Sequence, residues 1–314
     1  MVGCGAVGSL FAANLAQLDD VEVWAYDLAQ AHVDAINANG LRLVGAGEVL
    51  GQVTATADAS ELPPCDFGIV ATKAMHTEGA IAATAHAFAD GAVATVQNGV
   101  GNEEVVARHV SRVIRGTTFP AGKILEPGVV QWDVKGDTTL GPFEPSPARA
   151  EEIERLADAC TRGGMPTKAV EDARPAQWRK VIFNAATNPV GALTGLTHGR
   201  VCERADLRVL VSSLVAEGKA VAAAQGITLD ADPEELIDHA ARPEVAYDHK
   251  ASMLQDVEAR RLTEIDFLNG GIGRCGRDLG VPTPLNDAVA ALVRGLEASW
   301  GQVLHSHTQS REGV

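Results

Sequence analysis

The first half of the chain alternates short apolar runs with amphipathic stretches. The apolar runs predict strands and lie at residues 21–26, 67–71 and 92–96. The stretches between them have helical periodicity and lie at residues 9–18 and 78–88. Strands that alternate with helices indicate parallel β-α-β units and a mostly parallel sheet.

The pattern changes in the second half. Residues 116–141 are rich in glycine, proline and β-branched residues, which predicts further strands joined by turns, and a helix follows over 148–162. Helical periodicity then covers residues 175–191, 206–225, 233–241, 252–280 and 284–300. We therefore expect an α/β protein, with a Rossmann-type, mostly parallel sheet domain at 1–170 and an all-α helical, catalytic domain at 171–314.

Composition and charge narrow the range of partners. Hydrophobic residues make up 46% of the 314 positions, which suffices for packed cores. The net charge of −15 argues against nucleic acid and membrane partners, and no apolar run is long enough to span a bilayer. The five cysteines form no C-x-x-C pair, and the N-terminus lacks a signal-peptide pattern. These features predict a cytoplasmic protein without bound metal.

The N-terminus carries a glycine pattern typical of dinucleotide sites. In G-x-G-x-x-G the first glycine permits a tight turn, the second admits a pyrophosphate and the third lets a helix pack on a strand. A helix, a strand and an acidic residue follow in the expected order, which favours a nucleotide site over a simple glycine turn. The segment is Gly3-Cys4-Gly5-Ala6-Val7-Gly8.

Asp27 ends the second strand, 19 residues after Gly8. A carboxylate there can accept hydrogen bonds from the adenosine ribose and would repel the 2′-phosphate of NADP. No Lys or Arg lies between Asp27 and Arg42. The coenzyme is therefore expected to be NAD or NADP, with NAD favoured; the alternative is that Asp27 only caps the next helix.

The first strand is too short for its place in this fold. Only Met1 and Val2 precede Gly3, whereas a strand at mid-sheet normally has about five residues. Either the chain starts further upstream than the sequence given, which we favour, or the strand is a stub.

One predicted helix carries an unusual polar line. Lys180, Asn184 and Asn188 are spaced i, i+4 and i+8, so they share one face of an otherwise apolar helix. Buried polar groups need partners, and a small polar substrate would supply them. The alternative is a solvated stripe with a lysine that reaches to water.

Two polar positions follow predicted strands. Asn98 comes after the strand at 92–96, and Lys73 after the strand at 67–71. Open α/β sheets bind ligands at the carboxyl ends of their strands, so either residue could reach cofactor or substrate. The alternatives are an Asn-Gly turn and an ordinary exposed lysine.

Taken together, these motifs resemble those of ketopantoate reductases (2-dehydropantoate 2-reductases) in order and spacing over about residues 1–300. The matching segments are residues 3–8, 72–73, 97–99 and 178–189, then Ser252-Met253-Leu254-Gln255-Asp256 and Thr263-Glu264-Ile265-Asp266. The resemblance implies NAD(P)H-dependent reduction of a 2-keto acid, most simply ketopantoate to pantoate, as in pantothenate biosynthesis.

The resemblance also assigns roles to residues. It implies that Lys180 is the general acid and that Glu264 holds the lysine and the bound ligands. It places Lys73 and Asn98 at the junction of cofactor and substrate. It implies substrate contacts for Asn184, Asn188 and Ser252.

The sequence departs from the family pattern at three positions. His198 stands where the family commonly has a substrate-binding asparagine, so the keto acid could differ from ketopantoate. Gly122 stands where the family often has alanine beside the nicotinamide, and a backbone contact with the cofactor could survive there. Asp27 is the third departure, because NADP is usual in the family.

Ser252 and Glu264 impose a geometric condition. Twelve residues of straight helix would separate them by roughly 18 Å, more than a keto acid spans. If both reach one site, the helix predicted over 252–280 must break, and Arg260-Arg261-Leu262 is the expected place.

Two other functions compete with 2-keto acid reduction. A 3-hydroxyacid dehydrogenase would also use a lysine and an asparagine four residues later, but the motifs at Ser252 and Glu264 argue against it. A non-catalytic dinucleotide sensor would not need Lys180, Asn184 and Glu264. The helical domain could support a homodimer, and the partner expected above all is a small-molecule 2-keto acid.

Overall fold

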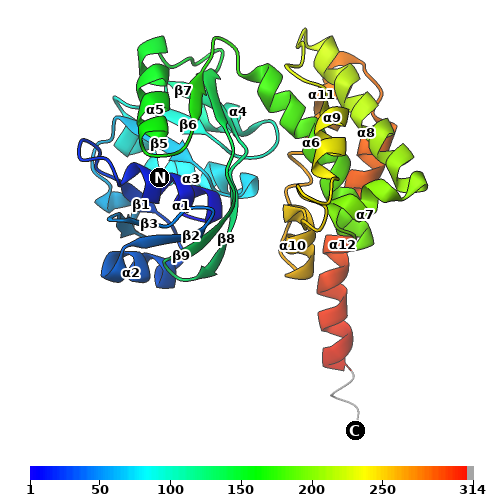
Figure 1. Cartoon of the computed structure of the whole chain (residues 1–314), viewed down its shortest axis with the longest axis horizontal. Coiled ribbons are helices and arrows are strands. Elements are labelled where there is room, and N and C mark those ends of the chain that lie inside the picture. Colours follow the sequence, from blue (N-terminus) through cyan, green and yellow to red (C-terminus); the bar gives the residue numbers. More distant parts are fainter. Residues whose placement is uncertain (310–314) are drawn as a thin grey trace. The chain divides into compact units, whose positions relative to one another are not determined.

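The computed structural model describes residues 1–309, with side chains through residue 300. Two compact units make up the chain. Residues 1–97 with 101–173 form an α/β unit, and residues 98–100 with 174–314 form a helical unit. Figure 1 shows the first mainly in blue to green and the second in green to red. The expected fold class, a Rossmann-type sheet followed by helices, is confirmed.

The main sheet of the α/β unit is mostly parallel. Strands β5, β6 and β7 pair in parallel, β10 joins β7 antiparallel, and β11 returns parallel to β10. A separate parallel pair is formed by β1 and β4. The strands are β1 (Trp24–Tyr26), β4 (Thr54–Thr56), β5 (Phe67–Val70), β6 (Ala92–Thr95), β7 (Val113–Thr118), β10 (Thr138–Pro142) and β11 (Thr167–Ala169).

Val2 is the link between the pair and the larger sheet. It makes parallel bridges to Tyr26 on one side and Val70 on the other. Its N–H donates to Ile69 O at 2.8 Å, and its carbonyl accepts from Ala71 N–H at 2.9 Å. On the other side the neighbouring residues complete the pairing, because Gly3 N–H donates to Tyr26 O and Tyr26 N–H donates to Met1 O, both at 2.9 Å.

A second, four-stranded sheet was not predicted as a unit. Its order is β3-β2-β9-β8, with β2 parallel to β9 and the other pairs antiparallel. Its strands are β2 (Leu41–Gly45), β3 (Val49–Gly51), β8 (Ala121–Glu126) and β9 (Val129–Val134). Helix α1 (Ala6–Leu15) packs against all four strands, so this sheet covers the helix that follows the glycine loop.

Helices cover both faces of the main sheet. Ile69 belongs to the core cluster around α1 and α5, whereas its neighbour Val70 belongs to the one around α3 and α4. Alternate residues of a strand point to opposite faces, so both faces are apolar and covered. The remaining helices of this unit are α2 (Gln30–Asn39), α3 (Thr77–Thr84), α4 (Asn102–Val106) and α5 (Ala150–Arg162), with short 3-10 turns η1 (Ala59–Glu61), η2 (Ala74–His76) and η3 (Ala85–Phe88).

The helical unit is built around one long buried helix, α6 (Arg174–Thr194). Helices α8, α9, α10 and α12 all pack against it, and one hydrophobic core joins them. Within residues 1–309 no helix is both long and apolar enough to cross a membrane. The other helices are α7 (His198–Glu203), α8 (Ala205–Ala224), α9 (Pro233–Ala240), α10 (Ser252–Glu258), α11 (Asn269–Leu279) and α12 (Pro284–Gln309).

The continuous helical periodicity over 252–280 does not give one helix. Helix α10 ends at Glu258, and Arg260 takes a left-handed conformation with φ 49°. Arg260 N–H donates to Val257 O and Arg261 N–H to Asp256 O, which is the hydrogen-bond pattern of a Schellman stop. The expected break near Arg260 is confirmed, and it leaves Glu264 on a non-helical segment before α11.

Candidate active site

The glycine loop has the sterics that a dinucleotide requires. A Cβ on Gly8 would lie 2.1 Å from the Gly3 carbonyl oxygen, and one on Gly3 would meet Thr72. A Cβ on Gly5 would meet no atom within 4 Å. Gly5 also caps the start of α1, where unpaired amides and the helix dipole favour an anion. The two outer glycines therefore serve packing, and the middle one faces open space.

The other residues of the glycine loop, Cys4, Ala6 and Val7, differ in burial. Cys4 is fully buried, and burial raises the pKa of its thiol to about 11. The thiol is therefore neutral at physiological pH, and its sulfur lies 3.5 Å from Ser9 Oγ. Ala6 and Val7 form the first turn of α1. The Cys4 side chain is therefore closed off from a cofactor, whereas Ala6 and Val7 are partly exposed.

Asp27 is tied to the glycine loop and to the next helix. Its Oδ2 accepts from Cys4 N–H at 2.8 Å, and its Oδ1 accepts from Ala29 N–H at 2.9 Å. Ala29 is the N-cap of α2. The carboxylate therefore links the glycine loop to the residue that begins α2, and its contact with a ribose stays a prediction.

The ends of β5 and β6 are joined by Gln97. Its Nε2 donates to Thr72 O at 3.0 Å and to Thr77 Oγ1 at 2.7 Å. Lys73 follows Thr72 directly and is partly buried at the N-cap of η2. Gln97 thus fixes the backbone from which Lys73 extends at the carboxyl end of the sheet.

Gly122 lies in β8, opposite Trp132 of β9, at a β-bulge. A Cβ there would fall 2.3 Å from the Gln131 carbonyl oxygen. The departure from alanine at this position is therefore explained by the close approach of β9.

The predicted polar line on α6 is present. Asn184 is 8% exposed and Asn188 is 6% exposed, and both lie on the helix that carries Lys180. Within residues 1–300 the Asn184 side chain makes no hydrogen bond, and Asn188 only accepts one from Thr187 Oγ1 at 3.4 Å. Two largely buried amides thus retain donors for a ligand, which a solvated stripe does not explain.

Asn98 and Glu264 are brought together in the helical unit. Asn98 Nδ2 donates to Glu264 Oε2 at 3.2 Å, and Glu264 is only 6% exposed. The backbones of the two segments are also hydrogen-bonded: Val100 N–H donates to Phe267 O at 2.9 Å. Sequence reasoning placed Asn98 at a strand end of the sheet domain; its contacts group it with the helices.

The charge of Glu264 acts on Lys180. Desolvation by burial lowers the pKa of Lys180 to about 8, and the Glu264 carboxylate opposes that shift. The ammonium form therefore predominates at neutral pH but loses its proton far more readily than a surface lysine. This is the pKa range expected of a general acid.

Ser252 and His198 occupy different settings. Ser252 is exposed at the first position of α10, a helix that packs on α6. His198 is buried, its ring stacks on Phe183 with centroids 5.5 Å apart, and its Nε2 lies 3.1 Å from Ile237 O. Burial is the main cause that lowers the pKa of His198, so the ring is neutral at pH 7.

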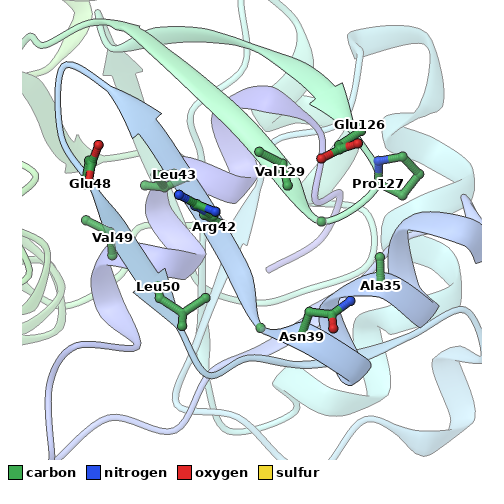
Figure 2. A pocket seen from close by; sticks show the side chains of 12 residues that line it. Ala35, Asn39, Arg42, Leu43, Glu48, Val49, Leu50, Glu126, Pro127 and Val129 are labelled. Carbon is green, nitrogen blue, oxygen red and sulfur yellow. The ribbon is translucent and has the colours of Figure 1, made fainter.

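The α/β unit also has a hollow of about 680 Å³ between the end of α2, strands β2 and β3, and the β8–β9 turn. Figure 2 shows Arg42, Glu48 and Glu126 among the side chains that line it. None of the predicted site residues lines it. In the part of the chain with described side chains, no cluster of three or more His, Cys, Asp or Glu could hold a metal ion.

Sequence reasoning missed Asn269, which is fully buried and donates to Ala185 O of α6 at 2.8 Å. The local signal was an asparagine beside two glycines at the start of a helix.

Two protein-family models match the chain. The model described as "Ketopantoate reductase PanE/ApbA" matches residues 1–145, and the model described as "Ketopantoate reductase PanE/ApbA C terminal" matches residues 172–297. The chain is 32% identical over 303 residues to a 2-dehydropantoate 2-reductase of Pyrococcus abyssi, covering 96% of this chain and 98% of that protein.

Solved structures agree over nearly the whole chain. A ketopantoate reductase of the PanE/ApbA family from Ralstonia eutropha JMP134 has a TM-score of 0.85 at 30% identity, covering 95% of this chain and 97% of that one. A D-mandelate dehydrogenase, solved with NADH and anilino(oxo)acetate, has a TM-score of 0.86 at 28% identity over the same shares.

Proposed function

Because this chain belongs to the ketopantoate reductase family, we propose that it reduces a 2-keto acid, ketopantoate first among them, to the 2-hydroxy acid with NADH or NADPH. The observation that carries this proposal is Lys180, a partly buried ammonium with a pKa of about 8. It stands on one helix face with two asparagines that keep donors available.

The chemistry needs a hydride and a proton. A nicotinamide coenzyme would supply the hydride to C2 of the keto acid, whose carbonyl oxygen would gain negative charge. The Lys180 ammonium stabilises that charge and donates its proton, which completes the C–H and O–H bonds of the product. Glu264 holds Lys180 in its charged form, and Asn98 fixes the Glu264 carboxylate.

Binding roles follow from the same arrangement. Asn184 and Asn188 would hydrogen-bond the carboxylate or the hydroxyl groups of the substrate. Ser252, Asn98 and His198 are the further substrate-binding residues that we propose. For the coenzyme we propose the loop Gly3-Cys4-Gly5-Ala6-Val7-Gly8 together with Asp27, Lys73, Asn98, Gly122 and Glu264.

Asp27 supports NAD as the preferred coenzyme. Its carboxylate is held in place by two backbone N–H groups, so it cannot easily turn away from a ligand beside the loop. A 2′-phosphate there would meet a fixed negative charge, whereas ribose hydroxyls could donate to it.

A second substrate class is favoured by His198. Its neutral ring is stacked on Phe183 and bonded to Ile237 O, so this position is aromatic and rigid. The D-mandelate dehydrogenase similar to this chain acts on an aromatic 2-hydroxy acid by its name. An aryl 2-keto acid such as phenylglyoxylate is therefore the alternative substrate.

The test is the initial rate of NADH and NADPH oxidation with ketopantoate and with phenylglyoxylate. Turnover of ketopantoate with the higher kcat/KM supports the first assignment, and a higher value for phenylglyoxylate supports the second. No turnover with either acid or coenzyme would overturn the proposed function.

A further inference from the structure

Helix α6 contains a proline, Pro189, which removes one of the backbone hydrogen bonds of the helix. Pro189 lies inside the helix and has no N–H, so it cannot donate to the carbonyl of Ala185 four residues earlier. Ala185 is 1% exposed, so water offers little replacement. An unpaired buried carbonyl commonly bends or opens a helix. The affected turn is the one that spans Asn184 and Asn188.

Asn269 of α11 supplies the missing donor. Its Nδ2 donates to Ala185 O at 2.8 Å and to Asn286 Oδ1 of α12 at 3.0 Å. Asn269 and Asn286 are both completely buried. The helix therefore continues through Pro189 to Thr194 with the Ala185 carbonyl satisfied by another part of the chain.

Glu217 of α8 sets the direction of this network. Its carboxylate, which only accepts, receives Asn286 Nδ2 at 2.8 Å and the N–H groups of Leu285 and Asn286 at 2.9 Å. Asn286 must therefore turn its Oδ1 toward Asn269. Because that oxygen can only accept, Asn269 must present its Nδ2 amino group to it. The same amino group then donates its second hydrogen to Ala185 O.

We propose that Asn269, oriented by Asn286 and Glu217, is a positioning residue for substrate binding. It replaces the hydrogen bond that Pro189 removes and so keeps Asn184 and Asn188 on one face with Lys180. This inference rests on the proposed function only where it is tested by the KM for the keto acid. The complementarity between Asn269 and Pro189 is independent of any activity.

The decisive experiment pairs two substitutions. Asn269→Leu removes the donor at similar size, and Pro189→Ala restores a backbone N–H for Ala185 O. We expect Asn269→Leu alone to raise the KM for the keto acid about tenfold, with kcat changed less than about threefold. Pro189→Ala alone and the double variant should both stay within about threefold of the wild-type KM. The pH profile should not move, because Glu264 and Lys180 are untouched.

An unchanged KM in Asn269→Leu, or a double variant as impaired as Asn269→Leu, would overturn the proposal. Should Asn269→Leu alone not fold, the double variant decides: recovery of folded protein by Pro189→Ala supports the proposal, and failure of both to fold rejects it.

A second readout separates this inference from the proposed function. If the wild type turns over no keto acid, the pair is judged by urea unfolding alone. The midpoint should then fall less for Asn269→Leu in the Pro189→Ala background than in the wild type; equal losses would reject the pairing. Asn14→Leu is the matched control, because Asn14 is also buried and donates to a helix carbonyl, Leu10 O at 2.7 Å. Its effect should be the same in both backgrounds.

Discussion

Asn98 donates a hydrogen bond to Glu264 across 3.2 Å, although 166 positions of sequence separate the two residues. The contact holds a buried carboxylate in the surroundings of Lys180. The residue that keeps the proposed acid protonated is thus itself held by a residue that follows a strand of the parallel sheet. Predictions about the acid therefore involve all three side chains.

Replacing Lys180 by alanine should remove the proton donor and the positive charge. We expect kcat to fall by about 10²- to 10⁴-fold, with a smaller change in the KM for NADH. Initial rates of coenzyme oxidation measure both. Lys168→Ala is the control, because Lys168 is exposed and its ammonium pairs with Asp137 on the α/β unit. Equal rates in wild type and Lys180→Ala would exclude Lys180 as the acid.

The pH dependence of kcat/KM should report the Lys180 ammonium. A general acid must be protonated, so activity is expected to be level below about pH 8 and to decline above it. Glu264 raises the pKa of Lys180, so Glu264→Gln should move the decline to lower pH. A profile over pH 5.5–10 in both forms tests this, and a decline that moves upward in Glu264→Gln would contradict it.

Gly5 and Gly8 should respond differently to alanine. A Cβ at Gly5 meets no protein atom, so Gly5→Ala should fold normally but raise the KM for NADH about tenfold by intruding on the pyrophosphate. A Cβ at Gly8 would lie 2.1 Å from the Gly3 carbonyl oxygen, so Gly8→Ala should lose about 3 kcal/mol of unfolding free energy. Urea unfolding and NADH titration separate the two effects. Equal loss of stability in both variants would argue against this division of roles.

Asp27→Asn should shift the coenzyme preference toward NADPH. The substitution removes the charge that opposes a 2′-phosphate, so the ratio of kcat/KM for NADPH over NADH should rise at least about tenfold. One of the bonds from Cys4 and Ala29 is also weakened, at a cost of about 1 kcal/mol. A wild type that already prefers NADPH would show that Asp27 serves only the loop and the helix.

Local patterns were enough for the fold class and for the polar line on α6. The hydrophobic periods of strands (two residues) and helices (3.6 residues) can be read from neighbouring positions in the sequence. Lys180, Asn184 and Asn188 lie within one helix, so their common face follows from their spacing alone. The helix stop near Arg260 was also predictable, though only from the distance that Ser252 and Glu264 would otherwise span. Its cause, a left-handed arginine, has no local signature comparable to a glycine.

Such local patterns could not predict which strands or side chains pair when they lie far apart in the sequence. Strand β2 pairs with β9, which begins at Val129, and nothing in either short segment specifies the partner. Asn269 contacts Ala185 across 84 positions, so its helix face looked like ordinary core. Asn98 was predicted to be a site residue, but its place among the helices depends on Phe267 and Glu264, far along the chain.

The three residues Asn98, Gly99 and Val100 group with the helical unit, while the chain on both sides of them belongs to the α/β unit. The polypeptide therefore passes between the units at three points, not one. No single cut can separate the molecule into two complete modules. A fragment that begins at Arg174 would lack the amide partner of Glu264, and a chimaera made by exchanging C-terminal halves between relatives would inherit Asn98 from one parent and Glu264 from the other.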